Sequence, residues 1–124
     1  MHAAIREEVL SAMSRVYDSN WYVLGPEVTE FEQAYSAFNQ VAHTVGVGNG
    51  LEALALALRA LGIGPSHEVL VPSNTYIATW LAVSQVGATP VPVEPDPATS
   101  NLDPARLEAA LTPRTRAILP VHLY

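Results

Sequence analysis

The sequence predicts an α/β fold with a mainly parallel sheet. Short hydrophobic segments that suit buried strands alternate with longer segments of helical periodicity along the 124 residues. Hydrophobic residues make up 49% of the chain and charged residues 15%, a composition typical of an ordered protein with a buried core. The length suits one small domain or a part of a larger one, and the sequence contains no internal repeat, linker or low-complexity segment.

Two amphipathic helices are predicted in the first third of the chain. In residues 3–18 apolar residues recur at helical spacing, with Arg6, Glu7 and Glu8 on the other side. A second helix is predicted to start with Pro26 at its first position, where a missing N–H is tolerated. We expect the second helix to bury an apolar stripe that consists of Val28, Phe31, Tyr35 and Phe38.

The middle of the chain alternates between strands and helices. Residues 43–48 are rich in valine and predict a strand, which a glycine-rich turn connects to a helix over residues 51–61. That helix is alanine and leucine on nearly every face, so we expect it to be covered on every face inside a larger body. Residues 68–71 predict a buried strand, and a helix over residues 76–85 follows. Three residues offer capping oxygens to it, namely Ser73, Asn74 and Thr75.

The last third predicts two more strands around one helix. The prolines in residues 90–94 suggest a strand at the edge of the sheet. Asp103 is placed to cap a helix that begins with Pro104, and residues 117–121 predict a buried strand. The spacing of Leu102 and Leu107 suits a hydrophobic staple at the start of that helix.

Charge and composition narrow the range of partners. The formal net charge of -6 argues against nucleic acid or an anionic membrane as the main partner. The lack of cysteine excludes disulfides, thiolate catalysis and cysteine-ligated zinc. No segment approaches the ~20 apolar residues of a membrane span, and the first residues do not resemble a signal peptide, so we expect a cytoplasmic protein. Small polar ligands and other protein chains remain as partners.

A glycine-rich turn gives the strongest local signal for a ligand. Gly46, Gly48 and Gly50 bring the backbone, without side-chain bulk, to a helix start whose free N–H groups can bind phosphate. A dinucleotide fingerprint fits less well, because Leu51 holds the third glycine position and Glu68 precedes its strand instead of ending it. A tight turn without a ligand stays an open alternative.

An aromatic residue follows the predicted strand 68–71. Tyr76 lies just beyond the carboxyl end of that strand, where open α/β sheets bind ligands, and its ring could stack on a flat molecule. Simple packing of the ring is the alternative. The four histidines show no metal-ligand spacing, and only His122, after the last predicted strand, has a suggestive position. No catalytic residue and no metal ligand can be assigned from spacing alone.

Four segments in order resemble the DegT/DnrJ/EryC1/StrS family of sugar aminotransferases, and the resemblance spans nearly the whole chain. The segments NGLEAL and PSNTYIATWLAVS are most similar to members that aminate C3 of a nucleotide-linked keto-deoxyhexose. The four segments are residues 21–32 (WYVLGPEVTEFE), 45–64 (VGVGNGLEALALALRALGIG), 68–88 (EVLVPSNTYIATWLAVSQVGA) and 116–124 (RAILPVHLY).

The resemblance implies that residues 1–124 are the N-terminal portion of a fold type I, aspartate aminotransferase-like large domain. Such proteins are homodimers that bind pyridoxal 5'-phosphate near the dimer interface. By the resemblance, the main-chain N–H groups of Leu51 and Glu52, after Gly50, hold the cofactor phosphate, and Tyr76 stacks on its ring. Many members have threonine at the position of Leu51, so here only a backbone contact is expected.

The chain also departs from the family pattern. All six basic residues are arginine, so the Schiff-base lysine is absent, as is the segment with the aspartate for the pyridine nitrogen. We therefore expect a fragment that is inactive alone. In the family's sheet, strands absent here lie between the first predicted strand and the later ones. Their absence should leave the helix over residues 51–61 and the strand edges uncovered and the isolated chain poorly soluble.

For the complete protein the resemblance implies amino transfer from an amino acid donor, glutamate, to a nucleotide-linked keto sugar. A sugar dehydratase on the same scaffold, in which histidine replaces the lysine, is the nearest alternative. A truncated remnant or an interaction module without chemistry is another. The segment that distinguishes the enzymes lies outside these residues.

Overall fold

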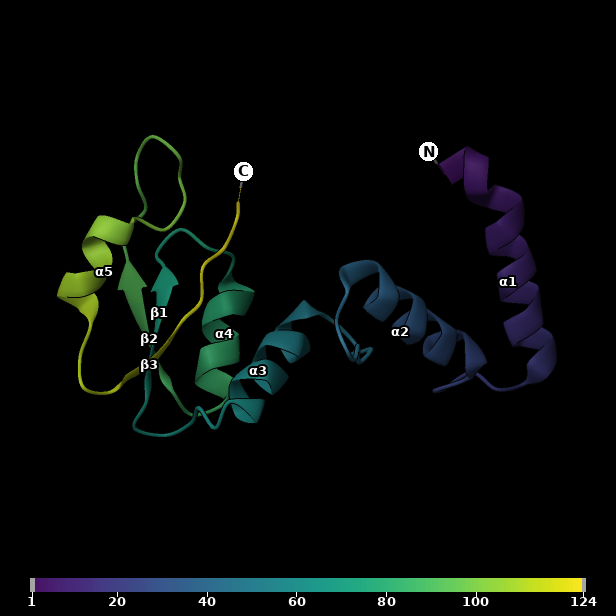
Figure 1. The fold of residues 1–124 in the computed structure, drawn as a ribbon, viewed down its shortest axis with the longest axis horizontal. Coiled ribbons are helices and arrows are strands. Elements are labelled where there is room, and N and C mark those ends of the chain that lie inside the picture. The colour runs from purple at the N-terminus through teal and green to yellow at the C-terminus, as the bar shows by residue number, and fades with distance from the viewer. Residues whose placement is uncertain (1, 124) are drawn as a thin grey trace. The chain divides into compact units, whose positions relative to one another are not determined.

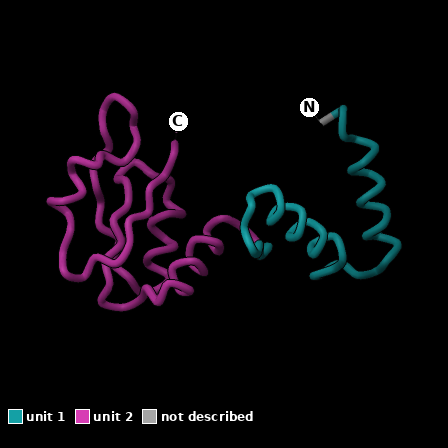
Figure 2. The backbone as a smooth tube through the Cα atoms, viewed as in Figure 1, with its two compact units in different colours: residues 1–46 teal, residues 47–124 magenta. Residues whose placement is uncertain are grey.

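The computed structural model describes residues 2–123 and is shown in Figure 1. The chain divides into two compact units, Met1–Gly46 and Val47–Tyr124, which Figure 2 distinguishes by colour. The first unit is helical, and the second contains a sheet with helices. No helix in the described residues is both long enough and apolar enough to cross a membrane.

The first unit consists of one short 3₁₀ turn and two α-helices. The turn η1 spans His2–Ile5, α1 spans Arg6–Ser19 and α2 spans Pro26–Asn39. Pro26 occupies the first turn of α2, as the sequence predicts. Each helix ends in a left-handed C-cap, at Asn20 and at Gln40, both with φ of 56°. Both amphipathic helices are therefore confirmed.

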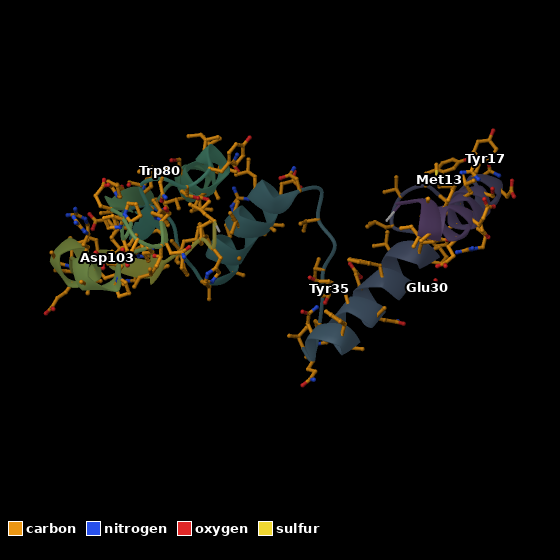
Figure 3. The ribbon with its side chains drawn as sticks, turned by 90° about the horizontal axis from the view of Figure 1, so that it is seen from above. Met13, Tyr17, Glu30, Tyr35, Trp80 and Asp103 are labelled. Atoms are coloured by element: carbon orange, nitrogen blue, oxygen red, sulfur yellow. The ribbon has the colours of Figure 1, made fainter. Side chains whose placement is uncertain are left out.

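The predicted burial of the apolar stripe on α2 is wrong for this chain. Phe38 is 81% exposed and Phe31 is 55% exposed, although the rings of Phe31 and Tyr35 stack with centroids 5.4 Å apart. Figure 3 shows the side chains of Met13 and Tyr17 on α1, and both are largely exposed. Neither helix contains a buried residue among those described, because the apolar face of a helix becomes buried only against another apolar surface.

The second unit is built on a parallel sheet of three strands. Strand β1 (Glu68–Pro72) lies between β2 (Thr89–Val93) and β3 (Thr115–Ile118), and both pairings are parallel. All five residues of β1 are buried. The prolines of β2 stand at an edge of the sheet, where a missing N–H is tolerated, as predicted. The last strand begins two residues and ends three residues earlier than predicted. None of its four residues is buried, so the prediction of a buried strand there is wrong for this chain.

Three helices accompany the sheet, and two of them form the core with β1. Helices α3 (Gly50–Ala60) and α4 (Ile77–Gln85) lie next to each other in Figure 1, and α5 (Pro104–Ala110) follows β2. Leu58 of α3 and Val83 of α4 are buried in one cluster with the β1 residues Val69 and Val71. Burying a side chain of this size stabilises the fold by roughly 1.5–3 kcal/mol. These contacts hold α3 and α4 against the sheet.

The predicted strand over residues 43–48 is absent from the structure. The segment is irregular, and Val45 is 76% exposed. A strand needs a neighbour that accepts its backbone hydrogen bonds, and no strand in the described residues pairs with this segment. The prediction that α3 is covered on every face is also wrong for this chain, since Leu56 is 48% exposed while Ala55 and Leu58 are buried.

Candidate cofactor-binding site

The start of α3 is closed by a pair of reciprocal hydrogen bonds. Asn49, in an extended conformation, is the N-cap, and its Oδ1 accepts a hydrogen bond from the Glu52 N–H at 3.0 Å. The Glu52 carboxylate reaches back and accepts from the Gly48 N–H at 3.1 Å. This arrangement is close to a capping box and stabilises the first turn of the helix. This cap was not predicted, although asparagine followed three residues later by glutamate is its usual sequence signal.

Two backbone donors at this helix start remain open. The N–H groups of Gly50 and Leu51 lie in the first turn, where no helical acceptor exists, and no described group accepts from either. A Cβ added at Gly50 would meet no atom within 4 Å, so a ligand can approach the backbone there. The residues therefore fit a phosphate at Gly50 and Leu51. The Glu52 N–H becomes available only if the Asn49 side chain rotates away.

Tyr76 is the N-cap of α4 and presents its ring to solvent. The residue is 75% exposed, and its carbonyl oxygen accepts a hydrogen bond from the Thr79 N–H at 3.0 Å. The loop before it is fixed to the sheet, because the Ser73 N–H donates to the carbonyl oxygen of Val93 at the end of β2. The backbone of Tyr76 is therefore held at the carboxyl edge of the sheet while its ring is free to contact a ligand.

The predicted capping of α4 by side chains of the preceding loop is wrong. Tyr76, and not one of the three predicted residues, is the N-cap, and no side chain makes a capping bond. The hydroxyls of Thr75 and Thr79 are hydrogen-bonded to each other at 2.8 Å instead. Asn74 Nδ2 donates to the carbonyl oxygen of Ser100 at 3.0 Å. In contrast, Asp103 caps α5 as predicted, since its Oδ1 accepts from the Ala105 N–H.

A charged cluster lies at the opposite, amino edge of the sheet. Glu68 is the first residue of β1, at the start of the strand predicted over residues 68–71, and its side chain is buried. The Thr112 hydroxyl and the Arg114 guanidinium both donate to its carboxylate. The hydrogen bond from Thr112 has the largest effect on the pKa of Glu68 and, together with those from Arg114, holds it below its usual value. Desolvation of the carboxylate acts in the opposite direction. The cluster joins the segment just before β3 to the start of β1 and lies away from the candidate site.

The remaining candidate residues do not join a site. His122 is exposed beyond the end of β3. No group of three or more acidic or histidine residues in the described part of the chain is placed to hold a metal ion. What the second unit offers is an open helix start and an exposed aromatic ring on two adjacent helices, both built on a parallel sheet.

These features place the chain among the α/β proteins with parallel strands, a class whose ligand sites commonly lie beyond the carboxyl ends of the strands. More specifically, the chain belongs to the DegT/DnrJ/EryC1/StrS aminotransferase family, which it matches over residues 3–124. The resemblance drawn from the sequence is thereby confirmed.

Curated relatives include sugar-nucleotide transaminases. The chain is 59% identical over 120 residues to dTDP-3-amino-3,4,6-trideoxy-alpha-D-glucose transaminase of Streptomyces venezuelae, covering 97% of this chain and 32% of the relative. It is 52% identical over 119 residues to dTDP-3-amino-3,6-dideoxy-alpha-D-galactopyranose transaminase of Aneurinibacillus thermoaerophilus, covering 96% of this chain and 33% of that protein. The chain thus spans about a third of the length of these relatives.

Solved structures of aminotransferases share the fold. S. venezuelae DesV in complex with a ketimine intermediate matches with a TM-score of 0.94 at 58% identity, covering 99% of this chain and 33% of DesV. NtdA from Bacillus subtilis with bound cofactor PMP matches with a TM-score of 0.91 at 36% identity, covering 95% of this chain and 27% of that one. The predicted fold is confirmed: the chain has the α/β architecture of part of a fold type I domain.

Proposed function

We propose that the complete protein containing this chain transfers an amino group from an amino acid, glutamate, to a nucleotide-linked keto sugar with pyridoxal 5'-phosphate as cofactor. The observation that carries the proposal is the 59% identity to a transaminase named for a dTDP-linked 3-amino sugar. The second relative reported above is also named for a dTDP-linked 3-amino sugar. A sugar with its keto group at C3 is therefore the substrate class that we propose.

The start of α3 is the proposed site of the cofactor phosphate. The main-chain N–H groups of Leu51 and Glu52, following Gly50, would donate to the phosphate oxygens, and the positive end of the helix dipole would favour the anion. The open backbone at Gly50 and the absence of an acceptor for the Leu51 N–H support this role. Leu51 has no hydroxyl, so its contribution is limited to the backbone.

Tyr76 is the proposed platform for the cofactor ring. Its exposed ring would lose water on stacking, and aromatic pairs of this kind contribute about 0.5–1.5 kcal/mol beyond the area they bury. When bound, pyridoxal phosphate would supply an aldehyde that accepts the amino group from the donor and a ring that acts as the electron sink. The part of these residues is to bind the phosphate and to orient the ring.

The chemistry itself requires residues outside this sequence. We propose that residues 1–124 are the N-terminal portion of the transferase domain and that the complete protein is a homodimer. The 124 residues contain no lysine, so by themselves they have no side-chain amine to form a covalent bond with the cofactor. We therefore expect the isolated chain to be inactive.

Cofactor attachment in the complete protein tests the proposal. Purified full-length protein is titrated with pyridoxal phosphate, and its visible absorbance is recorded before and after reduction with borohydride. We expect a coloured complex whose reduction fixes the cofactor to one lysine-containing peptide, detected by mass spectrometry. The 124-residue chain serves as the control, because it has no lysine-containing peptide that can be labelled. A full-length protein that binds no cofactor would contradict the proposal, and binding without covalent fixation would favour the dehydratase alternative.

A further inference from the structure

Asn74 joins two loops at the carboxyl edge of the sheet. It lies in the loop over residues 73–76, which ends with Tyr76, and its Nδ2 donates to the carbonyl oxygen of Ser100 at 3.0 Å. Ser100 lies in the loop over residues 94–103, between β2 and α5. The two partners are 26 positions apart, so this is a tertiary contact and not a local turn.

The loop that contains Ser100 is fixed by its own hydrogen bonds. The carbonyl oxygen of Asp96 accepts from the Ser100 N–H at 2.8 Å, and the Asp96 N–H donates to the carbonyl oxygen of Asn101 at 2.9 Å. The Asp96 carboxylate also accepts from the Ala98 N–H at 2.7 Å. Ser100 is held in the left-handed region, with φ of 57°, which a residue other than glycine adopts only where its surroundings impose it. The Ser100 carbonyl is therefore a preformed acceptor for Asn74.

The other bonds of the Tyr76 loop hold its two ends. The Ser73 N–H donates to the Val93 carbonyl at 2.9 Å, and the Tyr76 carbonyl accepts from Thr79 inside α4 at 3.0 Å. Between these ends, the Thr75 N–H donates to the Pro72 carbonyl at 3.3 Å, which is a contact within the turn. The Thr75 hydroxyl is also hydrogen-bonded to that of Thr79 in α4, at 2.8 Å. Among the described hydrogen bonds, the one from Asn74 is what ties the centre of the loop to the loop over residues 94–103.

We infer that Asn74 is a positioning residue for the cofactor site, which acts through Ser100 to fix the loop that presents the Tyr76 ring. The inference rests on the proposed function, because the orientation of an exposed ring matters only if a planar cofactor stacks on it. Ordering the loop before the ligand arrives removes that ordering cost from binding, so a fixed loop raises affinity without contributing a contact of its own.

The test compares isosteric variants of the full-length protein. Asn74→Asp keeps the shape of the side chain but loses the Nδ2 donor and places a carboxylate against the Ser100 carbonyl. We expect the Kd for pyridoxal phosphate, measured by fluorescence titration, to rise about threefold to tenfold. Amide hydrogen exchange at Thr75 and Tyr76 in the cofactor-free protein should also become faster. Asn39→Asp removes a donor of the same kind from the end of α2 and should change neither quantity.

A double-mutant cycle asks whether Asn74 acts through Tyr76. Tyr76→Ala removes the ring, so adding Asn74→Asp to it should weaken binding no further. If the double variant loses affinity by the product of the two single factors, Asn74 does not act through Tyr76 and the inference is overturned. Wild-type affinity and wild-type exchange rates in Asn74→Asp would also overturn it. A wild-type protein that binds no pyridoxal phosphate would overturn the proposed function and this inference with it. Binding by the wild type together with an unaffected Asn74→Asp variant would overturn the inference alone.

Discussion

Asn49 and Glu52 are joined by a hydrogen bond of 3.0 Å, in which the asparagine Oδ1 accepts the backbone N–H of the glutamate. The same N–H is one of the donors that we propose for the cofactor phosphate. The N-cap and the phosphate therefore compete for the Glu52 N–H, and a phosphate can accept from that group only if the Asn49 side chain moves.

Asn49→Ala should lower the thermal stability of the cofactor-free protein and increase the stabilisation that cofactor binding gives. Loss of the cap should cost about 1 kcal/mol of stability, while the freed Glu52 N–H should make the Kd for pyridoxal phosphate about twofold to fivefold lower. Thermal unfolding of the full-length protein with and without cofactor measures both effects. Asp103→Ala removes the equivalent cap from α5 and should lower stability without changing the response. An unchanged response in Asn49→Ala would show that the cap and the phosphate do not compete.

Glu52→Gln should tighten phosphate binding. The Glu52 carboxylate lies at the helix start, bonded to the Gly48 N–H, and would repel a phosphate there. Glutamine keeps an acceptor for that N–H and removes the charge, so we expect about twofold to fivefold tighter binding at low salt and a smaller gain at high salt. The Kd for pyridoxal phosphate, titrated at two ionic strengths, measures this. Glu27→Gln, at the start of α2, is the matched control. Equal affinities for the Glu52 variant and the wild type would place the phosphate elsewhere.

Protonation of Glu68 should lower the free energy of unfolding at acid pH. Its pKa is lower in the folded chain than in the unfolded chain, so its contribution is fully present above the ordinary glutamate pKa of about 4.3. That contribution is lost as the pH falls through the lowered, folded-state pKa. Urea unfolding of the full-length protein should show Glu68→Gln as less stable than the wild type at pH 7, with the difference shrinking toward acid pH. Exposed Glu94→Gln should show no such pattern. A difference independent of pH would contradict the argument.

The isolated 124-residue chain should be poorly soluble. Large apolar side chains are exposed in both units, among them Trp21, Phe38 and Val45 in the first and Leu56 in the second. Exposed apolar patches and open strand edges favour association. Analytical ultracentrifugation and thermal unfolding of the chain should show self-association and no cooperative monomeric transition. A soluble monomer that unfolds cooperatively would refute this prediction.

The sequence predicted the parts of the fold that local rules determine. Pro26 and Asp103 mark helix starts correctly, and the buried strand around Val69 was recognised from its hydrophobic run. The strand predicted near Val45 failed, as did the burial of Phe38, because both depend on a partner surface that the described residues do not provide. Residue patterns report what a segment would bury and not whether a neighbour is there to cover it.

The candidate site was predictable in outline only. Glycine at position 50 and Tyr76 were recognised from their places after predicted strands, and their assignment to a cofactor remains a prediction. The Asn49 cap was readable from its spacing to Glu52 but was overlooked. The bond between Asn74 and Ser100 could not be predicted, because a contact between residues 26 positions apart depends on the tertiary path of two loops.

Transfer of a labelled amino group tests the central proposal most directly. The full-length protein is incubated with pyridoxal phosphate, glutamate labelled with nitrogen-15 and a dTDP-linked 3-keto-6-deoxyhexose, and the sugar nucleotide is analysed by mass spectrometry. The account predicts a 3-amino sugar that carries the label, together with one 2-oxoglutarate per amino group transferred. A sugar that loses water and gains no nitrogen, or one that is recovered unchanged, would contradict it.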